Sequence, residues 1–213
     1  MKIVSVILAR GGSKGIPNKN IIDINGKPLI SYSIEAAQNV LSIDEVWVST
    51  DSDKIAKIAI EYGANIIQRP IDISGDRSKS EDALTHFANI VKFDIMVFIQ
   101  PTSPLLRSSD LELAIKKMNQ KKLDSIFSVY REHWIPRWTL NNKPFEWDIA
   151  NRPMRQDKSE LFVENGAFYI TTRNAFENSG LRYSGTIGTY EMSMERSFQI
   201  DTIEDVKLIK KLI

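Results

Sequence analysis

Residues that suit phosphate binding are gathered in one short segment near the N-terminus, residues 9–20, which reads ARGGSKGIPNKN. Its glycines let the backbone turn tightly and bring N–H groups close to an anion. Arg10 can hold a phosphate through two parallel hydrogen bonds, whereas Lys14 and Lys19 act as point charges. The Ser13 hydroxyl is a further donor. The segment therefore predicts a triphosphate-binding loop.

The spacing of this loop differs from two common phosphate-binding motifs, because it fits neither G-x-x-x-x-G-K-[ST] nor G-x-G-x-x-G. A solvent-exposed glycine turn with scattered basic residues is the alternative interpretation. The loop directly follows an apolar run at residues 3–9, however, and a long loop in a compact domain is usually functional. Since the net charge is only +1 over 213 residues, any such anion site must be local.

Short apolar runs alternate with helical patterns through the first 130 residues. Strands are expected at residues 3–9, 45–50, 65–68, 95–100 and 125–130. Helices are expected at residues 29–38, 53–62, 81–91 and 110–118. This alternation predicts an α/β fold of βαβ units around a Rossmann-like, mostly parallel sheet. Right-handed crossovers then place the C-terminal ends of the strands at one ligand-binding edge.

The alternation stops near residue 130. Residues 131–155 carry three tryptophans and three prolines, which makes them too apolar for a disordered linker and too broken for a helix. We expect an antiparallel arm there, inserted into a single domain that spans residues 1–213. The elements expected after it are a strand at 162–170, a helix near 173–178, a strand-like approach at 197–200 and a last helix at 203–213.

Composition excludes several classes of function. The chain has no cysteine, so a disulfide, a thiolate nucleophile and a cysteine-ligated zinc are impossible. Neither His86 nor His133 belongs to a cluster of zinc-ligand type, and no G-x-S-x-G hydrolase motif is present. No apolar run approaches the ~20 residues that span a bilayer, and no N-terminal signal is visible. We expect a cytoplasmic protein that binds neither nucleic acid nor membrane.

The loop also carries a family resemblance. The string ILARGGSKGIPNKNI at residues 7–21 resembles the signature of the CMP-acylneuraminate synthetases, the cytidylyltransferases that activate sialic acid. Four further strings agree with that family in order and spacing: RP at 69–70, QPTSPL at 100–105, ENGAFY at 164–169 and IDT at 200–202. The resemblance covers essentially the whole chain and implies a nucleotidyltransferase-type sheet.

The resemblance implies an enzyme that moves CMP from CTP to the anomeric hydroxyl of a nine-carbon α-keto sugar acid and releases pyrophosphate. Arg10 and Lys19 would neutralise charge on the α-phosphate and the leaving pyrophosphate. The other nucleotide contacts that the resemblance implies are Ser13 and Lys14 for the triphosphate, Asn20 for the ribose, Arg69 and Ser80 for the cytosine, and Gln100 where nucleotide and sugar meet. The implied sugar-binding residues are Gln100, Arg155, Asn165 and Tyr169.

Asp201 is the expected ligand of a magnesium or manganese ion, because such ions are often held by one or two carboxylates together with substrate phosphates. The alternative is that Asp201 or Thr202 merely caps the last helix, with Asp205 favouring the helix dipole. One departure from the family matters here. The family has two acidic residues, D-x-D, whereas this chain has Gln199 at the first position. A neutral amide is a weaker ligand than a carboxylate.

Residues 131–155 match the family's dimerisation domain, which reaches over the partner's active site, so a homodimer that uses CTP and a sugar acid is expected. Three alternatives stay open. The acceptor can be legionaminic or pseudaminic acid, or the eight-carbon 3-deoxy-manno-octulosonate, although QPT at residues 100–102 argues against the last. The chain can also be a nucleotide-binding module without catalysis, which only Gln199 favours. The third alternative is an NAD-dependent oxidoreductase, but this chain lacks the G-x-G-x-x-G motif of that class.

Overall fold

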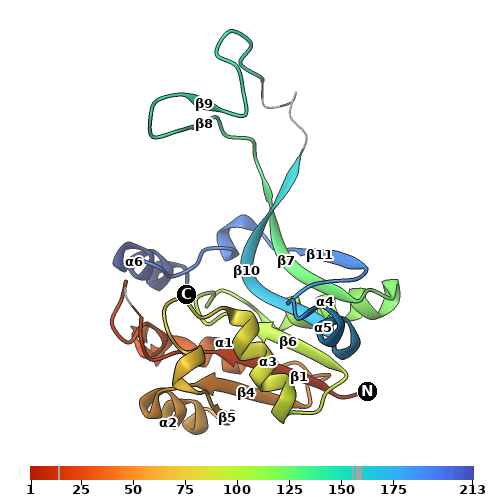
Figure 1. Ribbon diagram of the computed structural model, residues 1–213. Coiled ribbons are helices and arrows are strands. Elements are labelled where there is room, and N and C mark those ends of the chain that lie inside the picture. The colour runs from red at the N-terminus through yellow and green to blue at the C-terminus, as the bar shows by residue number, and fades with distance from the viewer. Residues whose placement is uncertain (14, 155, 157–159) are drawn as a thin grey trace.

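The apolar runs assemble into one central sheet in the computed structural model, which describes residues 1–13, 15–154, 156 and 160–213. Seven strands of the described residues lie in the order β11-β7-β10-β6-β1-β4-β5 (Figure 1). Their bounds are β1 Ile3–Leu8, β4 Glu45–Thr50, β5 Asn65–Gln68, β6 Ile95–Ile99, β7 Ser125–Glu132, β10 Leu161–Thr172 and β11 Ile187–Glu191. The five strands predicted before residue 131 and the one predicted at 162–170 are thereby confirmed.

Most of the sheet is parallel. β1 pairs in parallel with β4 on one side and β6 on the other, with Val4 opposite Glu45 and Met96. β4 pairs in parallel with β5, and β7 with β11. β10 runs antiparallel to both β6 and β7 and joins the two parallel groups. The predicted α/β fold with a mostly parallel sheet is confirmed.

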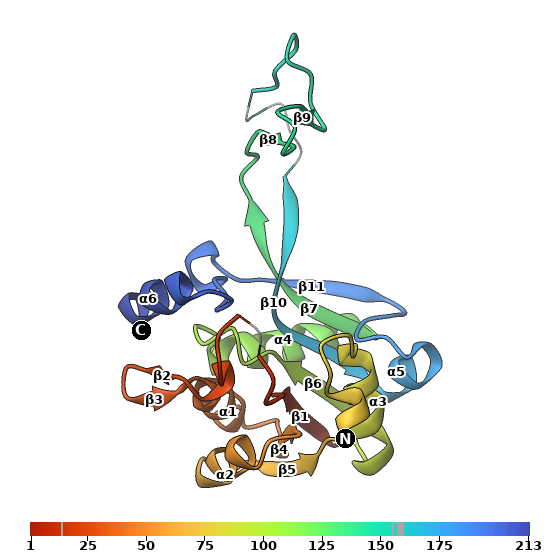
Figure 2. The same ribbon diagram turned by 60° about the vertical axis from the view of Figure 1, so that its left-hand side comes forward.

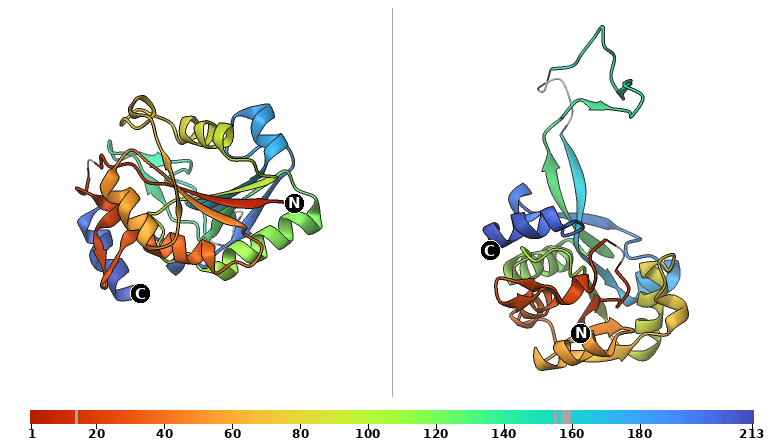
Figure 3. Two further views of the ribbon diagram at one scale, coloured as in Figure 1. Left: turned by 90° about the horizontal axis from the view of Figure 1, so that it is seen from below. Right: turned by 90° about the vertical axis from the view of Figure 1, so that its left-hand side faces the viewer.

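Helices cover both faces of this sheet, as Figure 3 shows in the view from below. Helices α1 (Leu29–Gln38), α2 (Asp53–Glu61) and α4 (Ser108–Lys121) pack on one face, and α3 (Ser80–Ile90) and α5 (Arg173–Ser179) on the other. Along β1 the side chains alternate between the two faces, so Ile3 and Ile7 join one core and Val4 and Val6 the other. Burial on both faces explains why β1 is apolar at every position except Ser5.

Two parts of the fold differ from expectation. Residues 197–200 form no strand: the N–H of the buried Ile200 donates to the carbonyl of Thr102 in a loop, at 2.9 Å. The edge strand β11 was not predicted, because its sequence IGTYE mixes polar and apolar residues and its Ile187 is half exposed. A short hairpin, in which β2 (Asp23–Ile24) pairs with β3 (Lys27–Pro28), was also not predicted.

A long arm leaves the domain between β7 and β10 (Figures 1 and 2). The two strands continue beyond the sheet as an antiparallel ribbon, with Phe162 opposite Arg131. Farther out, β8 (Arg137–Trp138) pairs with β9 (Pro144–Phe145). The indole rings of Trp138 and Trp147 pack edge to face, with 5.0 Å between their centroids. The arm therefore has a small aromatic cluster of its own and projects away from the main body.

The last helix, α6 (Ile203–Leu212), lies beside the β2–β3 hairpin (Figure 2). A separate apolar cluster holds it there, in which Ile200 and Ile209 pack with Ile16, Ile24 and Leu29. This cluster brings the C-terminal segment against the loop that follows β1. None of the helices in the described ranges combines the length and apolarity that crossing a bilayer requires.

Candidate nucleotide-binding site

A cavity of about 450 Å³ opens at the C-terminal edge of β1 and β6. Its walls come from the loop after β1, the short 3-10 helix η1 (Lys19–Ile21), the stretch from Arg69 to Ser80, the loop after β6, and the segment before α6. Eight of the residues predicted to act at the site line it: Arg10, Ser13, Lys19, Asn20, Arg69, Ser80, Gln100 and Asp201. The fold thus brings together side chains from both ends of the chain at the edge where ligands of α/β sheets bind.

Of the four other predicted residues, Asn165 and Tyr169 are not in this lining. Lys14 and Arg155 lie outside the described residues. Asn165 is buried, with its amide nitrogen donating to the Ser197 hydroxyl at 2.9 Å. Tyr169 is also buried, and burial, together with a hydrogen bond from its hydroxyl to a carboxylate, raises its pKa.

Tyr169 lies one layer behind the cavity wall. Its ring stacks on Phe98, which lines the cavity, with 5.4 Å between the ring centroids. Its hydroxyl donates to the Glu164 carboxylate. In this arrangement Tyr169 supports the wall, and Asn165 holds the turn of the chain beside it. Direct contact of either side chain with a sugar stays a prediction.

The loop after β1 is fixed by hydrogen bonds to the residue that follows β4 and to η1. The N–H of Gly11 donates to the Asp51 carboxylate at 2.8 Å, and the buried Asn20 amide donates to the carbonyl of Arg10 at 3.0 Å. Gly15 is required by close approach, because a Cβ at this position would lie 3.0 Å from the carbonyl oxygen of Asp201. Asn20 therefore shapes the loop in addition to any contact with ribose.

Arg69 is anchored below the cavity. Its guanidinium donates to the hydroxyl of Ser49 at 3.0 Å and to the carbonyl of Ser49 at 2.6 Å. Burial lowers the pKa of Arg69 to about 10, while the nearby Asp51 carboxylate opposes that shift. A pKa of about 10 leaves the guanidinium charged at neutral pH. Arg69 thus supplies a fixed positive charge at the side of the cavity where cytosine was expected.

The two cations expected at the phosphates each contact a carboxylate. Arg10 Nη1 lies 2.8 Å from Asp76 Oδ1, and Lys19 Nζ lies 2.9 Å from Asp201 Oδ1. Lys19 also donates to the carbonyl of Ile200 at 3.1 Å. Ion pairs that solvent reaches in this way contribute little to stability. An anionic ligand can therefore replace these carboxylates at low free-energy cost.

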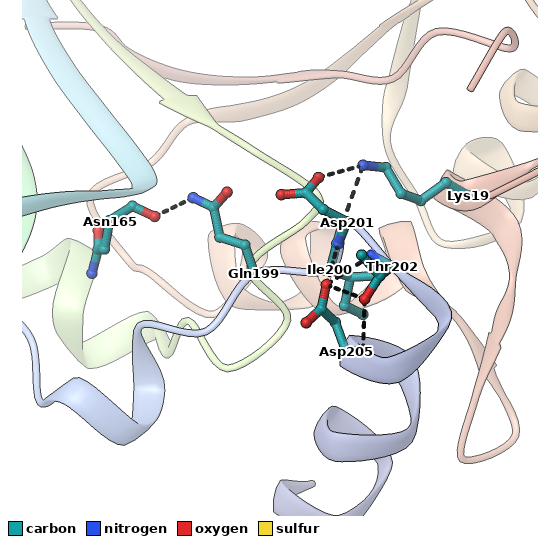
Figure 4. A network of polar contacts seen from close by, with 7 residues as sticks. All are labelled: Lys19, Asn165, Gln199, Ile200, Asp201, Thr202 and Asp205. Carbon is teal, nitrogen blue, oxygen red and sulfur yellow. Dashed lines mark hydrogen bonds and ion pairs between the residues drawn. The ribbon is translucent and has the colours of Figure 1, made fainter. Parts of the chain in front are cut away.

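Asp201 does not cap α6. The Thr202 hydroxyl accepts the N–H of Asp205 at 3.2 Å, and the Asp205 carboxylate accepts the N–H groups of Thr202 and Asp201 at 2.7 and 2.9 Å (Figure 4). This reciprocal arrangement is a capping box. The Asp201 carboxylate is left at the cavity, 68% exposed and beside Lys19.

The side-chain oxygens of Asp201 and Gln199 suit a divalent cation whose other ligands are the phosphate oxygens of a substrate. No group of three or more His, Asp or Glu side chains that could hold a metal occurs in the described part of the chain. Asp201 offers one carboxylate, and the amide of Gln199 lines the same cavity. Mg²⁺ typically binds through one or two protein carboxylates together with phosphate oxygens and water.

One wall of the cavity was not predicted from the sequence. The loop before α3 contributes Ile73, Gly75, Ser78 and Lys79 in addition to the predicted Ser80. A signal was present, because residues 74–80 read SGDRSKS, a polar run rich in small residues between two apolar segments. Such runs are typical of loops, and loops carry much of the function in α/β domains.

Comparison with known proteins agrees with this geometry. The sequence model of the family described as cytidylyltransferase matches residues 4–213. The chain belongs to the cytidylyltransferase family. It is 42% identical to the N-acylneuraminate cytidylyltransferase of Oncorhynchus mykiss over 93% of this chain and 47% of that protein. It is also 34% identical to the pseudaminic acid cytidylyltransferase of Campylobacter jejuni over 100% of this chain and 96% of that protein.

The resemblance inferred from the loop motif is thereby confirmed at the level of the family. The chain spans about half the length of the N-acylneuraminate cytidylyltransferases that it matches. Among solved structures, CMP:2-keto-3-deoxy-manno-octonic acid synthetase complexed with CTP has the same fold, with a TM-score of 0.77 and 23% identity, over 100% of this chain and 98% of that one.

Measurements of protein stability can test whether Thr202, and not Asp201, caps α6. Thr202→Ala removes the cap and should lower the free energy of unfolding by about 1 kcal/mol. Asp201→Asn should change it by less than about 0.5 kcal/mol, because it affects an exposed pair. Urea unfolding followed by circular dichroism measures both. A larger loss in Asp201→Asn than in Thr202→Ala would show that Asp201 is structural after all.

Proposed function

We propose that this chain transfers CMP from CTP to a nonulosonic acid and releases pyrophosphate. The observation that carries the proposal is the cavity at the sheet edge, where Arg10, Lys19 and Arg69 gather beside Gln100 and Asp201. Family membership supports the nucleotide, since the matching family is that of the cytidylyltransferases. We also propose that the reaction takes place in the cytoplasm, without a nucleic-acid or membrane partner.

The chemistry requires positioning and charge stabilisation more than covalent participation of the protein. The anomeric hydroxyl oxygen of the acceptor forms a bond to the α-phosphorus of CTP and releases its proton to water. The bond from that phosphorus to the pyrophosphate oxygen breaks. Arg10 and Lys19 are placed to stabilise the charge that develops on the phosphate oxygens, and Ser13 to donate a hydrogen bond to the triphosphate. Lys14 has the same proposed role.

Magnesium, or manganese, is proposed as the cofactor. Bound with CTP, such an ion would neutralise charge on the triphosphate. Asp201 would hold the ion after Lys19 has moved from the Asp201 carboxylate to a phosphate group of CTP. Asn20 is proposed to contact the ribose, and Arg69 and Ser80 to face the cytosine.

N-acetylneuraminic acid or a close relative is the proposed acceptor. The fish relative of 42% identity carries N-acylneuraminate in its name, and the bacterial relative of 34% identity carries pseudaminic acid. Legionaminic or pseudaminic acid is therefore the next candidate, and the eight-carbon 3-deoxy-manno-octulosonate follows it. Gln100, Arg155, Asn165 and Tyr169 remain the proposed sugar-binding residues. Gln100 lines the cavity, which supports its proposed position at the junction of the two substrates.

Pyrophosphate release measures this function directly. The chain is incubated with CTP, UTP, ATP or GTP, with a panel of sugar acids, and with Mg²⁺ or EDTA. We expect turnover with CTP and one nine-carbon acid, strong preference over the other nucleotides, and loss of activity in EDTA. Binding of CTP without pyrophosphate release under any condition would instead identify a non-catalytic nucleotide-binding module.

Arg10 offers the sharpest single-residue test of the proposed reaction. Arg10→Ala should lower kcat by about 100-fold or more, the scale of losing one preorganised donor to developing charge. Arg10→Lys should restore only part of the rate, because the two-pronged geometry of the guanidinium is lost. Lys57→Ala, which removes a charge from the exposed side of α2, serves as the control. Turnover near the wild-type value in Arg10→Ala would remove this residue from the reaction.

A homodimer is proposed on the basis of the arm. Its side chains Trp138, Leu140 and Ile149 are 52%, 103% and 65% exposed, which is a large apolar surface for an isolated projection. A second copy of the chain would cover it. Light scattering at micromolar concentration should give the mass of two chains. Leu140→Ser should shift the protein toward one chain, whereas Leu41→Ser, at an equally exposed leucine of the main body, should not. A single-chain mass for the unaltered protein would contradict the dimer.

A further inference from the structure

Gln199 is the residue by which this chain departs from its family's paired acids, and the structure gives its amide a fixed direction. The side-chain nitrogen Nε2 donates a hydrogen bond to the backbone carbonyl of Asn165, which lies in β10. A carbonyl can only accept, so the nitrogen of the amide must face it. The amide oxygen consequently points the other way. Figure 4 shows that oxygen on the side of the Asp201 carboxylate.

The neighbouring residue Ile200 explains why Gln199 and Asp201 share one cavity. The Ile200 side chain is fully buried, its N–H donates to Thr102 O at 2.9 Å, and its carbonyl accepts Lys19 Nζ at 3.1 Å. With Ile200 turned into the protein, Gln199 and Asp201 both line the cavity.

Gly166 provides the room that the Gln199 amide occupies. Its φ of +68° is in the left-handed region, which favours glycine. A Cβ at this position would lie 2.4 Å from Gln199 Nε2 and 2.7 Å from Gln100 Oε1. Any larger residue would therefore displace the amide. The turn at Gly166 and the side chain of Gln199 are matched in shape.

The oxygen of this amide accepts no hydrogen bond from the described residues, whereas the nitrogen is engaged. Hard divalent cations bind oxygen ligands, and a neutral amide oxygen next to a carboxylate provides such ligands. We propose that Gln199 supplies a neutral oxygen ligand to the divalent cation of the CTP complex, with the Asn165 carbonyl fixing its direction. The proposal rests on the proposed function, because it concerns the cation that accompanies CTP.

The neutral ligand has an electrostatic reason. Lys19 is the cation beside this pair, and its charge is already balanced by the single carboxylate of Asp201 at 2.9 Å. A second carboxylate at residue 199 would face the partial negative charge of the Asn165 carbonyl, where an amide nitrogen now donates. An amide therefore satisfies the carbonyl and still offers an oxygen to the cavity, which a carboxylate cannot do.

The test compares CTP affinity with saturating Mn²⁺ to CTP affinity in EDTA, by calorimetry without a sugar acid. The ratio of the two affinities reports the contribution of the cation. Gln199→Ala should lower this ratio about 10-fold, the scale of losing one element of a metal site. Gln199→Glu keeps an oxygen at the same chain length but cannot donate to the Asn165 carbonyl, so it should retain only part of the ratio. Gly166→Ala should lower it too, since the added Cβ displaces the amide.

Ser197→Ala is the matched control. It removes the hydroxyl that accepts the Asn165 side chain at 2.9 Å, and so loosens the same turn without touching Gln199. A merely structural role for Gln199 would alter both CTP affinities together and leave the ratio unchanged. An unchanged ratio in Gln199→Ala, an equal fall in Ser197→Ala, or no rescue by Gln199→Glu would overturn the inference. Failure of the unaltered protein to bind CTP at all would instead sink the proposed function.

Discussion

The burial of Ile200 is the constraint on which the rest of the site depends. Its side chain packs with residues from the loop after β1, the β2–β3 hairpin and α6, and its two backbone groups are held by Thr102 and Lys19. These contacts attach the end of the chain to the sheet edge and bring Asp201 within 2.9 Å of Lys19. Without that attachment, the first loop would have cations and glycines but no acidic side chain from the C-terminal segment.

Charge in the cavity is arranged in exchangeable pairs. Arg10 contacts Asp76, and Lys19 contacts Asp201, both in positions that solvent reaches. Arg69, in contrast, is buried and held by Ser49, so its charge is fixed in place. Two kinds of cation therefore surround the cavity: one that can turn to a ligand and one that cannot. Salt should weaken the first kind more, because screening acts chiefly on exposed pairs.

Much of the fold was predictable because burial on both faces leaves a clear trace in sequence. The runs at β1 and β6 are apolar at nearly every position, β4 has an apolar centre at residues 46–48, and the helices between them repeat at the expected spacing. The edge strand β11 lacks that trace because none of its residues is fully buried. The approach to α6 looked like a strand because Ile200 is buried, but its backbone partner is a loop.

The site was predictable where chemistry and position coincide, and less so where partners come from distant segments. Arg10 and Lys19 were identified by residue type and by following a buried strand. Their pairing with Asp76 and Asp201 depends on how the loops fold back, which no local pattern encodes. Tyr169 illustrates the same limit, since only the three-dimensional structure shows that its ring is stacked behind Phe98.

β10 pairs with β7 in two segments whose registers differ. Its outer part pairs with β7 in one register up to Glu164, and its inner part resumes in a different register at Tyr169. The Ser128 hydroxyl accepts the Phe168 N–H in the irregular stretch between them. Such a bulge interrupts the ladder, bends the strand and increases its local twist. The arm and the cavity wall therefore rest on separately registered parts of one strand, so a substitution that slips the pairing in the arm can leave the pairing behind the cavity in place.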